Sequence, residues 1–381
     1  MGSFRQLGGS SVPRTALLIV GVLAIEMAFV FSYVGGLGRP YPHGVPIAVV
    51  GSPAAQHLAI EKIRAAGTQF DVSAYPDRQS AVTAIEQHRL DGAIVLGSGT
   101  HDELIVAGAP SPAVASAIDT AVAEFEAGAG RTFTTTTVVP LSVNDPEGLG
   151  PFYLVVGWVV GGYLVASLVA LARGTEPSFR WALARLGALL AFSVASGVFG
   201  VLLASALMHL FPGNFWALAG LGTLVVFAVS AVTTAFQVLF GELGIALAIV
   251  VFVVVGNPSS GGPYPREFLG GVWRTVGAYL PNGAGLDGVR TIAYFGSNGL
   301  GSSVLVLVLY SLAGVVAVLA GTRWRDRQRV PVTAGPTGPA GPPGTDVSKG
   351  SGNGGHAEQP AVASTSPAAA PPDAAGDPGR G

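Results

Sequence analysis

The sequence predicts an α-helical integral membrane protein with six spans and an extracytoplasmic α/β domain inserted between the first and second spans. Three observations predict this fold class. Only 11% of the 381 residues are charged. Several apolar runs are long enough to cross a hydrocarbon core of about 30 Å. Between them, a stretch near 45–140 returns to polar residues, with periodicities of two and 3.6.

The predicted spans are apolar runs of about 20 residues, the length that a helix needs to cross a bilayer. The fifth is shorter, and it shares a tight connection with the fourth around Glu242, because residues 216–255 are too many for one span. The first run is predicted to be a retained anchor and not a signal peptide, because no small-x-small cleavage site follows it. The spans are 15–34, 152–172, 186–210, 215–239, 242–256 and 302–321.

Arginine placement predicts the orientation. Nine arginines flank the spans on one side, and the positive-inside rule puts that side in the cytoplasm of a bacterial plasma membrane. Both termini are then cytoplasmic: a short N-terminal segment, 1–14, and a disordered tail, 322–381, dense in Pro, Gly, Ala and Ser. The arginines are Arg5, Arg14, Arg173, Arg180, Arg185, Arg323, Arg325, Arg327 and Arg329.

Residues 35–151 are predicted to form the extracytoplasmic α/β domain. Three helices are expected after the N-caps Ser52, Asp77 and Ser111, the first and third with Pro at the first helical position. Strands are expected in "VPIAVV", "FDVSAY", "DGAIVL", "DELIVAG" and "RTFTTTTVV". The domain is large enough to have its own core.

No catalytic constellation is found, so we expect no enzyme activity and no cofactor. The chain has no cysteine, which excludes thiolate nucleophiles and Cys-based metal sites. "HDE" at 101–103 is interpreted as a polar turn rather than a metal site. "GSGT" at 97–100 leads into a strand, whereas a phosphate site needs a helix N-terminus. The net charge of −2 gives no nucleic-acid-binding surface.

Three polar residues in or near the spans are candidates for a transport or coupling role. Glu26 lies in the middle of the first span, where an ionised carboxylate facing lipid is costly. It is either part of a transport path or a neutral group hydrogen-bonded to a neighbouring helix. Gln237 belongs to a polar stripe, "SAVTTAFQ", of a kind that more often joins helices than binds substrate. Glu242 lies at the cytoplasmic turn.

Residues 257–300 are predicted to form a re-entrant or interfacial hairpin on the outer side. Asn257-Pro258 should end the fifth span. "REFLGGVWRTVGAYL" has the apolar spacing of an interfacial amphipathic helix. "PNGAGL" should break it, and a second short helix, "DGVRTIAYF", should follow with Asp287 as its N-cap.

Three motifs of this region resemble a known family. "FGELG" precedes the fifth span, "GNPSSGG" follows it and "LPNGAGLDGVRTIAYF" precedes the last span. The chain resembles, over 15–321, the actinobacterial branch of the ABC-2-type permeases and YhgE/Pip-like membrane proteins; "FLGG" at 268–271 departs from the usual Leu-Pro. The motif positions are Asn257, Pro258, Ser259, Ser260, Gly261, Gly262, Pro281, Gly283 and Arg290.

The resemblance implies a permease half that forms a homodimer in membrane lipid, with ATP hydrolysis by a separate subunit where the protein is a true ABC component. The leading hypothesis is therefore export of a lipid-like or small hydrophobic molecule. The alternative is a non-transporting envelope protein whose external domain binds a partner or phage.

The predicted topology can be tested by cysteine labelling, because the chain has no cysteine of its own. In intact cells, Ser98→Cys should react with a membrane-impermeant thiol reagent, whereas Ser178→Cys should react only after the cells are opened. The reverse pattern would overturn the assigned orientation.

Overall fold

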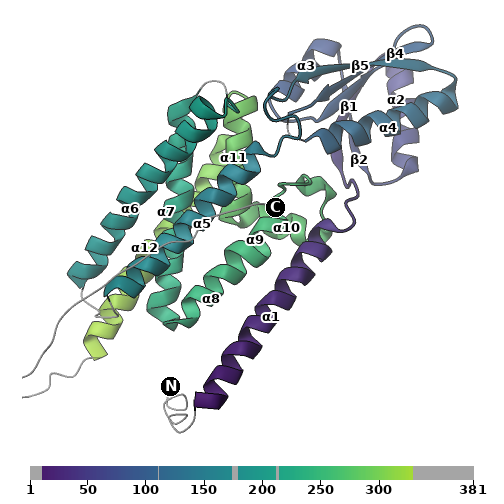
Figure 1. Ribbon diagram of the computed structural model, residues 1–381. Coiled ribbons are helices and arrows are strands. Elements are labelled where there is room, and N and C mark those ends of the chain that lie inside the picture. Colours follow the sequence, from purple (N-terminus) through teal and green to yellow (C-terminus); the bar gives the residue numbers. More distant parts are fainter. Residues whose placement is uncertain (1–10, 110, 174–178, 212–213, 329–381) are drawn as a thin grey trace, which may run out of the picture. The chain divides into compact units, whose positions relative to one another are not determined.

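The structure is a computed structural model that describes residues 11–109, 111–173, 179–211 and 214–328. Most of the predicted tail, 329–381, and most of the N-terminal segment, 1–10, lie outside these residues. The described residues form long apolar helices and one mixed sheet (Figure 1).

Five of the described helices are long and apolar enough to cross a membrane. They coincide with five of the six predicted spans, and the chain therefore has the helices of a multi-pass membrane protein. The predicted fifth span corresponds to a shorter apolar helix, Leu243–Ser259. The five long helices are α1 (Ser11–Leu37), α5 (Gly150–Arg173), α6 (Phe179–Val201, continued by the π-helix η2, Leu202–Leu207), α7 (Phe215–Phe240) and α12 (Leu300–Gln328).

Helix α7 is the centre of the bundle. It packs against α5, α6, α11 and α12, and 56% of its most apolar stretch is buried, as expected for a helix surrounded by others. A small residue allows α6 to approach α7 closely. A Cβ on Gly197 of α6 would lie only 2.4 Å from the Ala219 carbonyl oxygen of α7, so glycine is required there.

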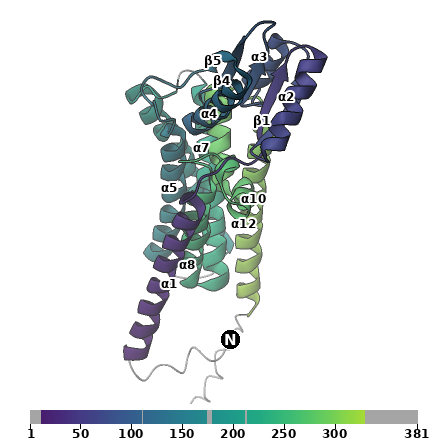
Figure 2. The same cartoon turned by 90° about the vertical axis from the view of Figure 1, so that its right-hand side faces the viewer.

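The α/β domain contains a five-stranded sheet with the order β2-β1-β3-β4-β5. All neighbouring strands are parallel except β3 and β4. Helix α3 covers one face, and α2 and α4 cover the other (Figures 1 and 2). The elements are β1 (Val45–Val50), α2 (Pro53–Ala66), β2 (Phe70–Tyr75), α3 (Arg78–Glu86), β3 (Gly92–Val95), β4 (His101–Ala107), α4 (Pro112–Ala129) and β5 (Thr132–Val139).

The three predicted N-caps of this domain are confirmed. The Ser52 hydroxyl accepts a hydrogen bond from the Ala55 N–H, and Asp77 accepts one from the Ser80 N–H at 2.8 Å. Ser111 accepts one from Ala113 at 3.2 Å. Each side chain satisfies one of the N–H groups that a helix leaves free at its start.

The hairpin differs from its prediction in three places. The short apolar helix continues past Asn257-Pro258, as α8 (Leu243–Ile249), the π-helix η3 (Val250–Val255) and α9 (Gly256–Ser259). The amphipathic helix is shorter than expected: a 3₁₀ turn, η4 (Arg266–Phe268), precedes α10 (Gly271–Tyr279). Helix α11 (Pro281–Tyr294) begins at Pro281, because Pro is favoured at the first helical position, so Asp287 is not its N-cap.

Two further predictions are wrong. Arg185 does not lie in a loop: α6 starts at Phe179, and Arg185 is buried within it. "HDE" is not a turn, because His101 begins β4 and its neighbours Asp102 and Glu103 make ion pairs with Arg131 and Arg78. In addition, α12 extends to Gln328, so residues 322–328 of the predicted tail are helical.

Candidate functional site

The residues of the "GNPSSGG" and "LPNGAG" motifs meet at the junction of α9, α10 and α11. Asn257, Ser259, Ser260, Asn282 and Arg290 are all buried there. Buried polar groups need hydrogen-bond partners, because an unpaired one costs about 1–3 kcal/mol. The partners within this junction therefore define its structure.

An asparagine pair joins α9 to α11. The side-chain N–H₂ of Asn282 donates to the Asn257 side-chain oxygen at 2.7 Å and to the Phe252 carbonyl at 2.9 Å. Gly256 leaves room for this pair, because a Cβ there would lie 2.4 Å from the Asn282 side-chain oxygen. The pair thus fixes α11 against the end of the π-helical segment.

A serine of α1 compensates for Pro258. Proline has no N–H, so it cannot bond the carbonyl four residues earlier, that of Val254. The Ser32 hydroxyl donates a short hydrogen bond to this carbonyl. This contact explains why the helix can continue to Ser259, and it joins α1 to η3, directly before α9.

Arg290 binds the turn that follows α9. Its Nη1 donates to the Gly261 carbonyl at 2.9 Å and its Nη2 to the Gly262 carbonyl at 3.2 Å. Gly261 has φ +87°, a conformation that favours glycine. A second arginine contact lies nearby, an ion pair that joins Arg266 of η4 to Asp287 of α11. The Arg290 guanidinium thus supplies hydrogen-bond donors to two carbonyls of this turn.

The remaining motif residues also serve the packing of this junction. Ser259 and Ser260 donate to the carbonyls of Val255 and Asn257, both at 2.7 Å. A Cβ on Gly283 would lie 2.0 Å from the Gly277 carbonyl oxygen, which makes glycine necessary where α11 crosses α10. Pro281 opens α11.

Gln237 belongs to a separate polar cluster inside the bundle. Arg185 donates to the Gln237 side-chain oxygen and to the Ala166 carbonyl, the latter at 2.7 Å. The Gln237 N–H₂ group donates to Ser167 at 3.4 Å. The cluster connects α5, α6 and α7, as expected of a polar residue that joins helices.

Glu26 and Glu242 lie outside these clusters. Both side chains are exposed, Glu26 in the middle of α1 and Glu242 at the turn between α7 and α8. Among the described residues, no hydrogen bond or ion pair is found for either carboxylate. The structure therefore brings together the motif residues of the hairpin but keeps the three coupling candidates apart.

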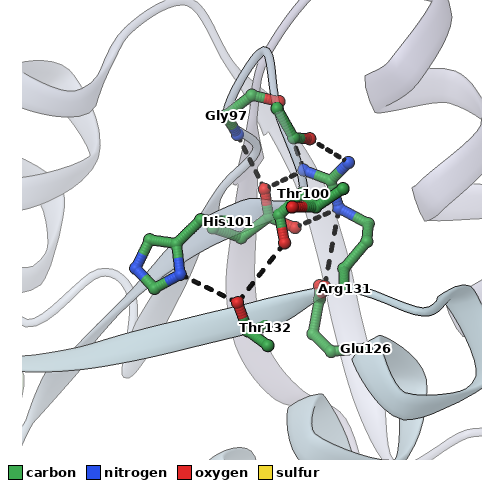
Figure 3. Close-up of polar contacts among 8 residues, drawn as sticks. Gly97, Thr100, His101, Glu126, Arg131 and Thr132 are labelled. Atoms are coloured by element: carbon green, nitrogen blue, oxygen red, sulfur yellow. Dashed lines mark hydrogen bonds and ion pairs between the residues drawn. The ribbon is translucent and has the colours of Figure 1, made fainter.

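A buried carboxylate pair in the α/β domain was not predicted (Figure 3). Asp102 accepts hydrogen bonds from Arg131 Nε and from the Gly97 N–H, both at 2.7 Å. Arg131 also donates to the Gly99 carbonyl at 2.6 Å, and its Nε lies 3.6 Å from Glu126. Together these contacts hold the loop between β3 and β4. The alternation of residues in β4 could have revealed that Asp102 is buried, because Asp102 lies on the same sheet face as the buried Leu104 and Val106.

The two carboxylates have opposite pKa shifts. Burial would raise the pKa of Asp102, but the hydrogen bonds from Arg131 and the Gly97 N–H hold it below its ordinary value. Burial and the neighbouring Asp102 raise the pKa of Glu126 to about 7. Its two oxygens are buried and accept no hydrogen bond from the described residues. No group of three or more Asp, Glu or His residues suited to a metal ion occurs in the described part of the chain.

Comparison of the chain with protein-family models, with curated proteins and with solved structures found no match.

Replacing Arg290 by lysine should destabilise the hairpin. A lysine lacks the fork that serves two carbonyls at once, so at least one buried carbonyl loses its donor, at a cost of about 1–3 kcal/mol. We expect a lower apparent Tm of the full chain in detergent. Arg274→Lys is the matched control, because Arg274 is exposed and makes one contact, with the His43 carbonyl. Equal effects of the two substitutions would contradict the assigned role.

Stability should depend on the protonation of Glu126. The folded carboxyl keeps its proton up to about pH 7, whereas the unfolded one loses it near its ordinary pKa of about 4.3. Stability from this group is thus present at low pH and is lost as the pH rises to about 7. The apparent Tm should fall from pH 5 to pH 8 less steeply in Glu126→Gln than in the wild type. Glu124→Gln, exposed on the same helix, should keep the wild-type slope.

Proposed function

We propose that the protein is the membrane subunit of an ABC-2-type exporter. It acts as a homodimer with a separate ATPase subunit and moves a lipid-like or small hydrophobic substrate out of a bacterial cell. Leu243–Ser259 is then a sixth crossing, the α/β domain is extracytoplasmic and both termini are cytoplasmic.

The observation that carries this proposal is the convergence of the motif residues. Asn257 bonds Asn282, and Arg290 bonds the carbonyls of Gly261 and Gly262, across 25–29 residues of sequence. Motifs that depend on one another in this way are a structural unit and not a chance composition. This supports the resemblance from which the permease function is inferred.

The arrangement of the arginines supports the orientation. The Arg323 guanidinium lies 4.4 Å from the centre of the Phe179 ring, so the end of α12 and the start of α6 are neighbours. Arg180, Arg323 and Arg327 are exposed at these ends. Together they form a basic end of the bundle, as expected of a cytoplasmic side.

The turn between α7 and α8 is the surface that we assign to the ATPase subunit. Gly321 of α12 lies against Val238 near the end of α7, so this turn belongs to the same end of the bundle. Phe240 and Leu243 flank Glu242 and are 54% and 72% exposed. These exposed apolar side chains give a partner subunit a surface to pack against.

Helix α1 is the surface that we assign to the second copy of the chain. Its apolar side chains are largely exposed, and Glu26 lies among them. A carboxylate in hydrocarbon is costly unless it is protonated or hydrogen-bonded. A second α1 can supply that hydrogen bond, since two protonated carboxyls can pair with each other.

One observation favours the alternative, an envelope protein whose external domain binds a partner. A cavity of about 250 Å³ lies between α2 and α4. Its wall is apolar, with Ile63, Phe70 and Phe125, and Lys62 and Glu124 line it as well. Such a groove suits a peptide side chain, and it needs no transport function.

Affinity purification from a mild detergent extract, followed by mass spectrometry, tests the proposal. A nucleotide-binding ATPase should co-purify in near-stoichiometric amount with the wild type, and Glu242→Arg should reduce it several-fold. Glu124→Arg, which reverses a charge in the α/β domain, should not. Recovery of envelope proteins without an ATPase would favour the alternative.

A further inference from the structure

The loop between β3 and β4 has a backbone anchor at each end. At its start, the Leu96 N–H donates to the Val50 carbonyl at 2.8 Å. At its end, the Thr132 N–H donates to the Thr100 carbonyl at 2.9 Å. The residues between these anchors, 97–99, are exposed, so they need other partners to hold one conformation.

Asp102 and Arg131 supply those partners (Figure 3). The Gly97 N–H donates to the Asp102 carboxylate at 2.7 Å. The Arg131 guanidinium donates to the Gly97 carbonyl at 3.2 Å and to the Gly99 carbonyl at 2.6 Å. The backbone groups of these two glycines make no other hydrogen bond with the described residues. The order of the loop therefore depends on the position of one guanidinium.

All three nitrogens of that guanidinium are already in use. Nε and Nη2 donate to Asp102, Nη2 also donates to the Gly97 carbonyl, and Nη1 donates to the Gly99 carbonyl. A further buried anion beside Arg131 would compete with the loop carbonyls for these N–H groups.

Glu126 becomes such an anion when it loses its proton. Its carboxyl lies 3.6 Å from Arg131 Nε, and both of its oxygens are buried and accept no hydrogen bond from the described residues. A neutral carboxyl tolerates this position better than an ionised one, because a buried charge without a partner is costly. Ionised Glu126 must therefore draw N–H groups of Arg131 away from the loop.

Among the described residues, two charged groups act on the Glu126 carboxyl: Asp102 from β4, and Arg131 from the connection between α4 and β5. Burial and the Asp102 carboxylate raise the pKa of Glu126 to about 7. Burial acts in the same direction on Asp102, but hydrogen bonds to its carboxylate outweigh it and lower the pKa of Asp102. Asp102 is thus already ionised where Glu126 titrates. His101 lies beside the cluster, with Nδ1 2.9 Å from the Thr132 hydroxyl.

We propose that this cluster is a pH switch for the loop 97–99. In acid, Glu126 is neutral and Arg131 holds the loop. At higher pH, the two ionised carboxylates share Arg131, its bonds to the glycine carbonyls are lost and the loop is released. The switch does not depend on the proposed export function, because every residue in it belongs to the α/β domain. If that domain is extracytoplasmic, as proposed, the switch responds to the pH outside the cell.

Spin labelling tests the switch directly. The chain has no cysteine, so Ser98→Cys places a single nitroxide label in the exposed middle of the loop. In the purified full-length protein, the EPR spectrum should show a label that is more mobile at pH 8.5 than at pH 5, with a midpoint near pH 7. Glu126→Gln keeps a neutral side chain beside Arg131, so its loop label should retain the low-pH spectrum throughout. Agreement with the wild type at pH 5 would verify that this variant is folded.

The controls separate the switch from other titrations and from general loosening of the domain. Glu124→Gln, exposed on the same helix, and His101→Gln should both keep the transition. A label on Ser116→Cys, exposed near the start of α4, should keep one mobility across the pH range. Unchanged mobility of the loop label, or an undiminished transition in Glu126→Gln, would overturn the proposal. Loss of the transition in His101→Gln, or an equal gain in mobility at position 116, would also overturn it.

Discussion

In apolar surroundings, every backbone carbonyl that a helix leaves free must find a donor, and this constraint shapes the hairpin. The chain leaves its helical ladder at Pro258 and again in the turn at Gly261 and Gly262. Ser32, Asn282 and Arg290 supply the missing donors. These donors come from α1 and α11. The carbonyls of the hairpin therefore have hydrogen-bond partners only when α1 and α11 are packed against it.

The hairpin is also where the α/β domain and the bundle meet. Phe295, directly after α11, stacks on His88 with the ring centres 4.1 Å apart and belongs to one face of the domain's core. Phe268 belongs to the core on the other face of the sheet. A shift of α11 would therefore disturb the contacts of Asn282 in the bundle and those of Phe295 in the α/β domain.

Local signals predicted much of this fold. The capping residues and strand alternation of the α/β domain depend on neighbours within a few positions, and Ser52, Asp77 and Ser111 cap their helices as expected. The errors arose where contacts between residues distant in sequence determine the local structure. Ser32 allows the helix to pass Pro258, and Gln237 together with the Ala166 carbonyl gives Arg185 a buried partner. The acidic pair Asp102 and Glu126 likewise depends on Arg131, which lies in the connection between α4 and β5.

Disulfide crosslinking between α1 and α9 tests most directly whether the hairpin is held as described. A Cβ on Gly36 would lie 3.3 Å from the Pro258 Cβ, whereas none of the described atoms lies within 4 Å of a Cβ on Gly21, nearer the start of the same helix. The Cβ atoms of a disulfide are about 3.8 Å apart. In native membranes, Gly36→Cys with Pro258→Cys should crosslink within one chain on mild oxidation, and Gly21→Cys with Pro258→Cys should not. Absence of a crosslink in the first pair, or equal crosslinking in both, would contradict this account of the hairpin.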